Sequence, residues 1–255
     1  MKETVKTALS MIEDGMTVSL GGGNTVAALA EAIAKSGKKI QVITPSIDTK
    51  LLCGQYGIPL FDFSCPDPVS IAFDGCDELD ENLNALKSCG AIHTREKIAA
   101  SLADSYVLFA SEAKIAKDLK WKHPLTLEVL PCALSLVHKK IEELGGRTEP
   151  RKAQAKSGLV ISDDGNLIVD AWFEQKPDLA PRELAAFLDQ IPGLVGHALF
   201  AGIAAKAIVE TEDGQARIVE ADTDYRNTDD RKRRIDAYVE RKTELGTCRN
   251  RMDRA

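Results

Sequence analysis

The sequence is poor in aromatic residues and has no long apolar run. Phe, Trp and Tyr make up 5% of its 255 residues. No apolar stretch approaches the roughly 20 residues that a membrane-spanning helix needs, and the opening MKETVKTALSMIEDGM has charges where a signal peptide would carry its apolar core. With 44% apolar and 28% charged residues, the composition is typical of a globular protein with one large core or two modest domains. We therefore expect a cytoplasmic protein.

No Cys-x-x-Cys pair occurs, so the sequence indicates neither a disulfide framework nor a zinc site. We expect the cysteines to be reduced thiols. They are scattered along the chain: Cys53, Cys65, Cys76, Cys89, Cys132 and Cys248.

Basic residues are in the minority except near the C-terminus. The net charge is −6, yet residues 223–255 carry ten Lys and Arg against seven Asp and Glu, while the preceding residues carry 23 against 32. The acidic main part argues against general nucleic-acid binding, which depends on neutralising phosphates. The basic cluster at 231–234 could contact RNA, an anionic lipid or another subunit. A solvated helix with interleaved acids is the expectation for this segment.

Strand-like and helix-like stretches alternate over the first half of the chain, which is typical of a parallel sheet covered by helices. Residues 17–46 form one strand–helix–strand unit whose helix is closed by Gly37. Two further buried strands, at 68–75 and 106–114, bring the number of parallel strands to about four. The predicted fold class is α/β, with an open, mostly parallel sheet and helices on both faces (Rossmann-like).

The pattern changes after Pro124 to strand, helix, two strands, helix, strand, which is a split βαβ arrangement. Its two middle strands are expected to form a hairpin over 158–173, turning at an Asp-Gly pair. A closing hairpin at 204–220 is expected to rejoin the first sheet. We thus predict a catalytic α/β domain of residues 1–122 and 200–222, a small ferredoxin-like α+β domain at 123–199, and a charged C-terminal extension at 223–255.

A glycine-rich loop, Gly21–Thr25, lies between a predicted strand and a predicted helix. Free amides at that helix N-terminus would suit a phosphate, and glycines would allow close approach to the backbone. A dinucleotide site fits poorly, because Val26 stands where a GxGxxG motif needs glycine and no acid ends the second strand. A Walker loop is excluded because no lysine follows the glycines. A tight turn without a ligand remains the alternative.

The acidic segment Asp74–Asp80 follows a buried strand at the sheet edge where open parallel sheets bind ligands. No adjacent basic residue neutralises these carboxylates. They could bind a divalent metal, or they could transfer protons and recognise hydroxyls on a polyol. An exposed acidic loop is the alternative.

A lysine and a glutamate follow this segment within about twenty residues. Lys87 could be an electrophile and Glu96 a general base. Glu96 lies in the first turns of a predicted helix, where the helix field favours the ionised carboxylate, so its pocket must be partly desolvated for it to act near neutral pH. In the alternative interpretation, Lys87 is a surface cation and Glu96 completes a capping box with His93 or Thr94.

Taken together, these motifs resemble those of the type A ribose-5-phosphate isomerases. The resemblance rests on the glycine-rich loop, DGxDE, KxxGAxxxREK and a later AxxxK, in this order and spacing, and it extends from about residue 5 to 221. It implies the interconversion of ribose 5-phosphate and ribulose 5-phosphate, with no metal or organic cofactor. Glu96 would then move a proton between C2 and C1 through an enediolate, while Lys87 would stabilise the negative oxygen. Asp74 and Asp77 would hold the sugar hydroxyls.

The same resemblance implies a phosphate site and a set of partners. A small sugar phosphate would be the ligand, with neither nucleic acid nor membrane as a partner, and a homo-oligomer, dimer or tetramer, is implied by the resemblance alone. The residues that would bind substrate or phosphate are Gly22, Gly23, Asn24, Thr25, Gly90 and Lys114.

The chain also departs from the family pattern. Gly22 and Asn24 replace the threonine and serine of GTGST, and Ser88 and Cys89 replace two glycines of KGGGA. These changes leave open an isomerase for another sugar phosphate or a non-catalytic sugar-phosphate sensor on the same scaffold. A CoA-transferase with a nucleophilic glutamate fits less well. A Cys89–His93 nucleophile pair is also less favoured than simple packing of Cys89, because no third orienting group is visible.

Overall fold

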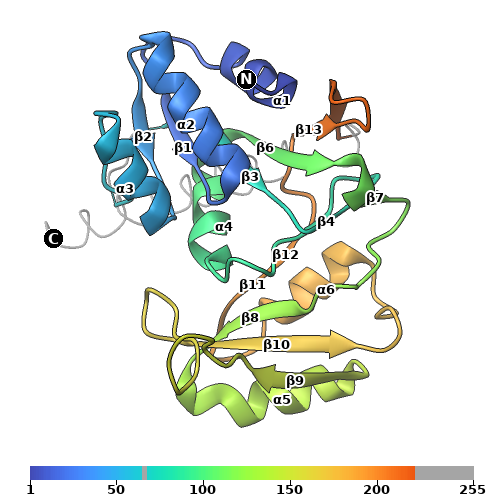
Figure 1. Ribbon diagram of the computed structural model, residues 1–255. Helices are drawn as coiled ribbons and strands as arrows, with labels where there is room; N and C mark the ends of the chain where they lie inside the picture. Colours follow the sequence, from blue (N-terminus) through green and yellow to red (C-terminus); the bar gives the residue numbers. More distant parts are fainter. Residues whose placement is uncertain (65–67, 222–255) are drawn as a thin grey trace, which may run out of the picture. The chain divides into compact units, whose positions relative to one another are not determined.

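A computed structural model describes residues 1–64 and 68–221 (Figure 1). Its main sheet has six strands in the order β14-β13-β6-β3-β1-β2. All neighbouring strands are parallel except β14, which is antiparallel to β13. The prediction of an open, mostly parallel sheet is confirmed. The strands are β1 (Thr17–Leu20), β2 (Gln41–Ile43), β3 (Val69–Gly75), β6 (Ala103–Ser111), β13 (Lys206–Glu210) and β14 (Ala216–Glu220).

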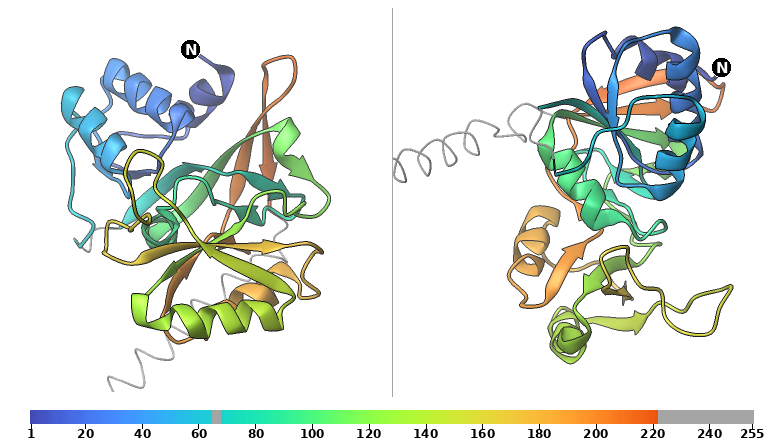
Figure 2. Two further views of the ribbon diagram at one scale, coloured as in Figure 1. Left: turned by 60° about the horizontal axis from the view of Figure 1, so that its bottom comes forward. Right: turned by 90° about the vertical axis from the view of Figure 1, so that its left-hand side faces the viewer.

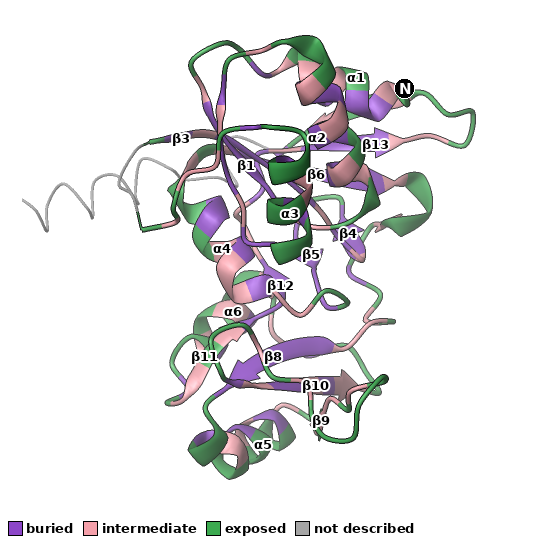
Figure 3. Cartoon of the chain, turned by 60° about the vertical axis from the view of Figure 1, so that its left-hand side comes forward, coloured by how far each residue is buried: buried purple, intermediate pink, exposed green. Residues whose placement is uncertain are grey.

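Apolar side chains alternate between the two faces of this sheet, as the two-residue period of a strand requires. In β3, Ile71 and Phe73 pack on one side with residues of α1, α2 and α3, whereas Ala72 packs on the other side with Ala100 of α4. Buried residues therefore follow the strands, while helices such as α3 expose one face (Figure 3). The helices are α1 (Glu3–Ser10), α2 (Asn24–Ser36), α3 (Ile47–Gln55) and α4 (His93–Leu102).

The order of strands leaves a crevice beside β1. The chain passes from β1 through α2 to β2 on one side, and β3 pairs with β1 on the other side. Loops that leave the carboxyl ends of two such strands diverge, and ligands of open α/β sheets bind between them. The loop after β1 is the glycine-rich segment, and the loop after β3 is the acidic segment.

A second, mostly antiparallel sheet of four short strands, in the order β12-β5-β4-β7, holds the segment between the acidic residues and Lys87. The sequence indicated only a loop here, because strands of two or three residues carry too little periodicity to detect. They are β4 (Glu78–Asp80), β5 (Ala85–Leu86), β7 (Ile115–Ala116) and β12 (Leu199–Phe200).

The third sheet is antiparallel, in the order β11-β8-β10-β9, and buries one face against α5 and α6. Its element order is the predicted strand, helix, two strands, helix, strand. The elements are β8 (Leu125–Val129), α5 (Leu134–Glu143), β9 (Gly146–Pro150), β10 (Leu167–Phe173), α6 (Pro181–Leu188) and β11 (Leu194–His197).

The hairpin predicted over 158–173 is only partly correct. The long partner of β10 is β9, whereas the expected first arm makes isolated bridges such as that between Ile161 and Leu167. The strand β9 escaped detection because it is an edge strand that begins with glycine and ends with proline. The closing hairpin is as expected, since β13 pairs in parallel with β6 of the main sheet (Figure 2).

No helix in residues 1–64 and 68–221 is long and apolar enough to cross a membrane. The prediction of a solvated basic helix near residues 231–234 lies outside the described residues, as do Cys65 and Cys248.

Candidate active site

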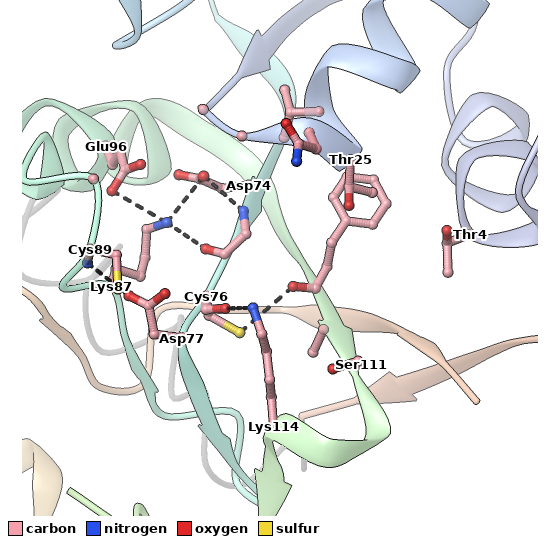
Figure 4. A pocket seen from close by; sticks show the side chains of 18 of the residues that line it. Thr4, Thr25, Asp74, Cys76, Asp77, Lys87, Cys89, Glu96, Ser111 and Lys114 are labelled. Atoms are coloured by element: carbon pink, nitrogen blue, oxygen red, sulfur yellow. Dashed lines mark hydrogen bonds and ion pairs between the residues drawn. The ribbon is translucent and has the colours of Figure 1, made fainter. Parts of the chain in front are cut away.

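A cavity of about 440 Å³ lies at the carboxyl ends of β1, β3 and β6. This volume falls within the range of small-molecule sites. All ten residues that the sequence singled out line it: Gly22, Gly23, Asn24, Thr25, Asp74, Asp77, Lys87, Gly90, Glu96 and Lys114. Figure 4 labels six of them, namely Thr25, Asp74, Asp77, Lys87, Glu96 and Lys114.

Lys87 is the buried centre of an ionic cluster. Its Nζ lies 3.1 Å from Asp74 Oδ1 and 3.3 Å from Glu96 Oε2, and it donates a hydrogen bond to the Gly75 carbonyl oxygen. The Phe200 ring centroid is 5.6 Å away. Burial alone would lower the pKa of Lys87, but the charges of Asp74 and Glu96 raise it above its usual value. The ammonium therefore keeps its proton and is not a surface cation.

Glu96 lies in the first turn of α4 and is only 6% exposed. Burial and the neighbouring Asp74 carboxylate raise its pKa to about 8, against the opposing effect of Lys87. The residue before the helix is Ile92, and no side chain caps this helix end, so the alternative of a capping box is wrong. A carboxyl group with such a pKa can accept and return a proton near neutral pH.

Asp74 is held in place by Gly75, which belongs to the DGxDE motif, and by Tyr106, which sequence reasoning missed. Its carboxylate accepts hydrogen bonds from the Gly75 amide at 2.8 Å and from the Tyr106 hydroxyl at 3.3 Å. A Cβ at Gly21 would lie 2.2 Å from Asp74 Oδ1, so only glycine fits there. The first glycine of the loop thus makes room for the carboxylate, which is a role that its place in the motif could have suggested.

Asp77 fixes the loop that follows Lys87. Its Oδ2 accepts hydrogen bonds from the backbone amides of Ser88, at 2.7 Å, and Cys89, at 2.9 Å. Neither of these two backbone hydrogen bonds uses its other oxygen. That oxygen is available to a ligand hydroxyl.

The two remaining acids of the segment have local structural roles. Glu78 accepts hydrogen bonds from the amides of Lys120, Trp121 and His123, and Asp80 closes a turn by accepting from the amide of Asn84. The hypothesis of a divalent metal held by the whole segment gains no support. Among the described side chains, no group of three or more His, Cys, Asp and Glu is arranged to hold a metal ion.

Groups suited to an anion gather at another part of the cavity. The N-cap of α2 is Gly23, with φ of 91°, and no side chain caps the first amides of the helix. Lys114 follows β6 in a short 3₁₀ turn, and its Nζ donates to the Cys76 carbonyl oxygen. Figure 4 shows Thr25 and Lys114 on the side of the cavity away from Glu96. Uncapped helix amides and an ammonium are the groups that bind phosphate.

The cavity also includes residues for which the sequence gave no signal, among them Thr4 and Glu210. Cys89 lies at its edge, and burial together with Asp77 raises the pKa of this thiol to about 11. Burial lowers the pKa of His93 to about 3, which leaves its imidazole neutral. Both shifts disfavour a Cys89–His93 nucleophile pair, because the thiol stays protonated.

Known proteins resemble this chain over most of its length. The sequence model of the family described as ribose 5-phosphate isomerase A (phosphoriboisomerase A) matches residues 41–214. The relative named ribose-5-phosphate isomerase A from Prochlorococcus marinus (strain MIT 9211) is 39% identical over 215 residues, which cover 82% of this chain and 90% of the relative. The protein of the same name from Synechococcus sp. (strain ATCC 27144 / PCC 6301 / SAUG 1402/1) is 36% identical over 217 residues, covering 83% and 93%.

Solved structures agree with this similarity. The structure of ribose 5-phosphate isomerase A from Methanocaldococcus jannaschii superposes with a TM-score of 0.78 at 33% identity, covering 86% of this chain and 96% of that one. A D-ribose-5-phosphate isomerase in complex with phospho-erythronic acid superposes with a TM-score of 0.80 at 34% identity, covering 85% and 96%. By sequence and by fold, this chain belongs to the ribose 5-phosphate isomerase A family of enzymes.

Proposed function

We propose that the protein interconverts ribose 5-phosphate and ribulose 5-phosphate by proton transfer within the cavity at the ends of β1, β3 and β6. The observation that carries this proposal is the contact of Lys87 Nζ with both Asp74 and Glu96. The carboxyl group of Glu96, with its raised pKa, and the charged ammonium of Lys87 would therefore contact the same small ligand. Substrate and product are isomers, so the reaction needs no other reactant.

Glu96 is the proposed base. In the open-chain aldose, its carboxylate takes the proton from C2, and the electron pair forms the C1–C2 double bond of an enediolate while the carbonyl oxygen at C1 becomes negative. Glu96 returns the proton to C1, and a proton moves from the oxygen on C2 to the oxygen on C1. The C2 atom becomes the ketone carbon. The burial of Glu96 supports this role, because it brings the pKa close to working pH.

Lys87 is the proposed electrophile. A carbon acid beside a carbonyl ionises only if the developing oxyanion meets positive groups already in place, and one such donor contributes roughly 3 kcal/mol. Asp74 and the Gly75 carbonyl hold the Lys87 ammonium before substrate arrives. The free oxygen of Asp77 would bind sugar hydroxyls and assist ring opening.

The phosphate would bind between the start of α2 and Lys114. The backbone of Gly22–Thr25 offers amides, and Gly22 and Asn24 supply no hydroxyl, so the anion would be held by backbone donors, the Thr25 hydroxyl and the Lys114 ammonium. This arrangement would place the sugar carbonyl toward Lys87 and Glu96.

The test is a coupled assay of ribulose 5-phosphate formation. Wild-type protein should convert ribose 5-phosphate, also after dialysis against a chelator. Glu96→Gln should lower kcat by on the order of 10²- to 10⁴-fold while the protein remains folded. The matched control is Glu81→Gln, which removes an exposed carboxylate from the turn between β4 and β5 and should leave kcat unchanged.

The same assay discriminates the other interpretations. Turnover of another aldose phosphate in place of ribose 5-phosphate would retain the chemistry and change the substrate. Thermal stabilisation by pentose phosphates without any turnover would indicate a sensor and refute the proposed reaction.

A further inference from the structure

Arg151 reaches the active-site loop from the antiparallel β-sheet of residues 125–197. It follows β9, and its guanidinium donates hydrogen bonds to the carbonyl oxygens of Ser88, at 3.0 Å, and Cys89, at 3.3 Å. These two residues come directly after Lys87. The guanidinium thus contacts the backbone of the segment that carries the proposed electrophile.

Residues of β8 and β10 hold the guanidinium in position through hydrogen bonds. Asp170 accepts hydrogen bonds from Nε at 2.8 Å and from the terminal nitrogen at 2.6 Å, so the pair is bidentate. Thr126, which faces Asp170 across the β8–β10 pair, accepts a hydrogen bond from Arg151 at 2.8 Å. The side chains of Arg151 and Asp170 are 20% and 14% exposed. A bidentate pair that is this well buried holds its geometry far better than a surface ion pair does.

The Ser88–Cys89 peptide is held at both ends. Its carbonyl oxygen accepts from Arg151, and its amide donates to Asp77 Oδ2. Carbonyl and amide of a trans peptide point in opposite directions, and the described residues contain no cis peptide bond. Arg151 and Asp77 therefore lock the orientation of this unit from opposite sides.

The Cys89–Gly90 peptide is oriented in the same way. Its carbonyl oxygen, on Cys89, points to Arg151, so the amide of Gly90 points away from Arg151. Gly90 lines the cavity and has no side chain that could restrain the peptide. Without Arg151, rotation of this unit would meet little resistance.

We propose that Arg151, held by Asp170, is a positioning residue for the isomerase reaction: it orients the Ser88–Gly90 backbone so that the Gly90 amide and Lys87 meet the substrate. This inference rests on the proposed function. It gives the part of the chain that forms the antiparallel sheet an indirect role in catalysis, although none of the ten predicted site residues belongs to this part.

The experiment compares three variants of the full chain. Arg151→Lys keeps a positive charge opposite Asp170, but an ammonium lacks the planar set of donors with which the guanidinium bonds both carbonyl oxygens. The double variant Arg151→Gln/Asp170→Asn removes both charges, so that no unpaired carboxylate is left buried. The matched control is Arg147→Gln. Arg147 is an exposed residue of β9, the edge strand that Arg151 follows, and its guanidinium lies over the Trp172 ring.

Steady-state kinetics and hydrogen exchange provide independent readouts. We expect kcat to fall about 10- to 100-fold in both Arg151 variants, with KM changed less than about threefold, because a small misplacement of a reacting group affects mainly the chemical step. The amides of Ser88 and Cys89 should exchange faster, while those of β8 and β10 stay protected. The Arg147 variant should match the wild type in both measurements.

Two results would overturn the inference. One is wild-type kcat together with wild-type exchange at Ser88 and Cys89 in the folded double variant. The other is a loss of activity in proportion to the unfolded fraction, with faster exchange throughout β8 and β10, which would show a structural role only. If wild-type protein turns over no pentose phosphate, the proposed function fails, and the exchange data alone still decide whether Arg151 orders the loop.

Discussion

Three charged side chains, Asp74, Lys87 and Glu96, share a buried site that holds one cation and two carboxyl groups. Each is at most 6% exposed. Two carboxylates beside one ammonium cannot both be ionised at low cost, so the proton affinity of one of them rises. Burial and the neighbouring Asp74 carboxylate raise the pKa of Glu96, which makes Glu96 the group that binds the proton.

The rate of the free enzyme should follow the ionisation of Glu96. Because its pKa is raised to about 8, kcat/KM should increase about tenfold per pH unit on the acid side and level off above that pKa. Lys87→Gln removes the cation that lowers the pKa of Glu96, so it should move the acid limb to higher pH as well as reduce the rate. An acid limb of the kcat/KM profile with its midpoint near pH 4.5, the ordinary pKa of a glutamate, would contradict the assignment of Glu96 as the base.

The same shift predicts how stability depends on pH. A carboxyl group whose pKa is higher in the folded protein contributes stability below its unfolded pKa of 4.5, and this contribution is lost as pH rises through about 8. Glu96→Gln should therefore be more thermostable than the wild type at pH 8.5, with a smaller difference at pH 5. Melting curves of both proteins across this range test the prediction. A difference that shrinks as pH rises would refute it, and Glu81→Gln should show no such trend.

Among the structural elements, the hairpin of β4 and β5 determines which carboxylates of the segment Asp74–Asp80 face the cavity. Because side chains alternate along β4, Glu78 and Asp80 turn away from the cavity, and Asp77 before the strand turns toward it. The hairpin then returns the chain to Lys87, beside the end of β3. Adjacent positions in the sequence thus place the Asp77 carboxylate in the cavity lining and the Glu78 carboxylate against the backbone amides of another loop.

This division can be tested with Glu78→Gln and Asp77→Asn. Glu78 accepts hydrogen bonds from three backbone amides, and an amide side chain would turn a donor toward one of them. We expect Glu78→Gln to lower the free energy of unfolding by about 1–3 kcal/mol, and to leave kcat per folded molecule unchanged. Asp77→Asn should instead lower kcat. Chemical denaturation and the coupled assay measure the two effects, and a loss of kcat in the Glu78 variant would contradict the division.

For the whole molecule, the cavity combines loops from the main sheet with the small sheet, and ligand binding should stabilise all of these parts together. Because Glu96→Gln should convert ribose 5-phosphate only slowly, it can be mixed with this ligand and its unfolding measured before much ligand is consumed. At about 100 times its dissociation constant, the ligand should raise the free energy of unfolding by about 2.7 kcal/mol. Ribose without phosphate should give a much smaller shift in Tm. A second Lys114→Gln substitution should reduce the shift at equal concentration, and an unchanged shift would contradict the phosphate site.

The sequence by itself determined the fold class and the residue types of the site. Strand and helix periods over residues 17–114 predict the parallel sheet, and Gly37 ends α2 with the left-handed φ of 73° expected of a C-terminal glycine. These signals are local, because they depend on neighbours within one turn or one strand. The motifs around Asp74, Lys87 and Glu96 are likewise compact enough to be recognised along the chain.

Only the tertiary structure decided which groups face one another. Arg151 contacts Ser88 from 63 positions away, and Tyr106 reaches Asp74 across 32. Short strands such as β4 and the edge strand β9 form because partners distant in sequence supply their hydrogen bonds, so their own residues carry little periodicity. The raised pKa of Glu96 has the same origin, because it depends on burial among side chains from several elements, which no local pattern encodes.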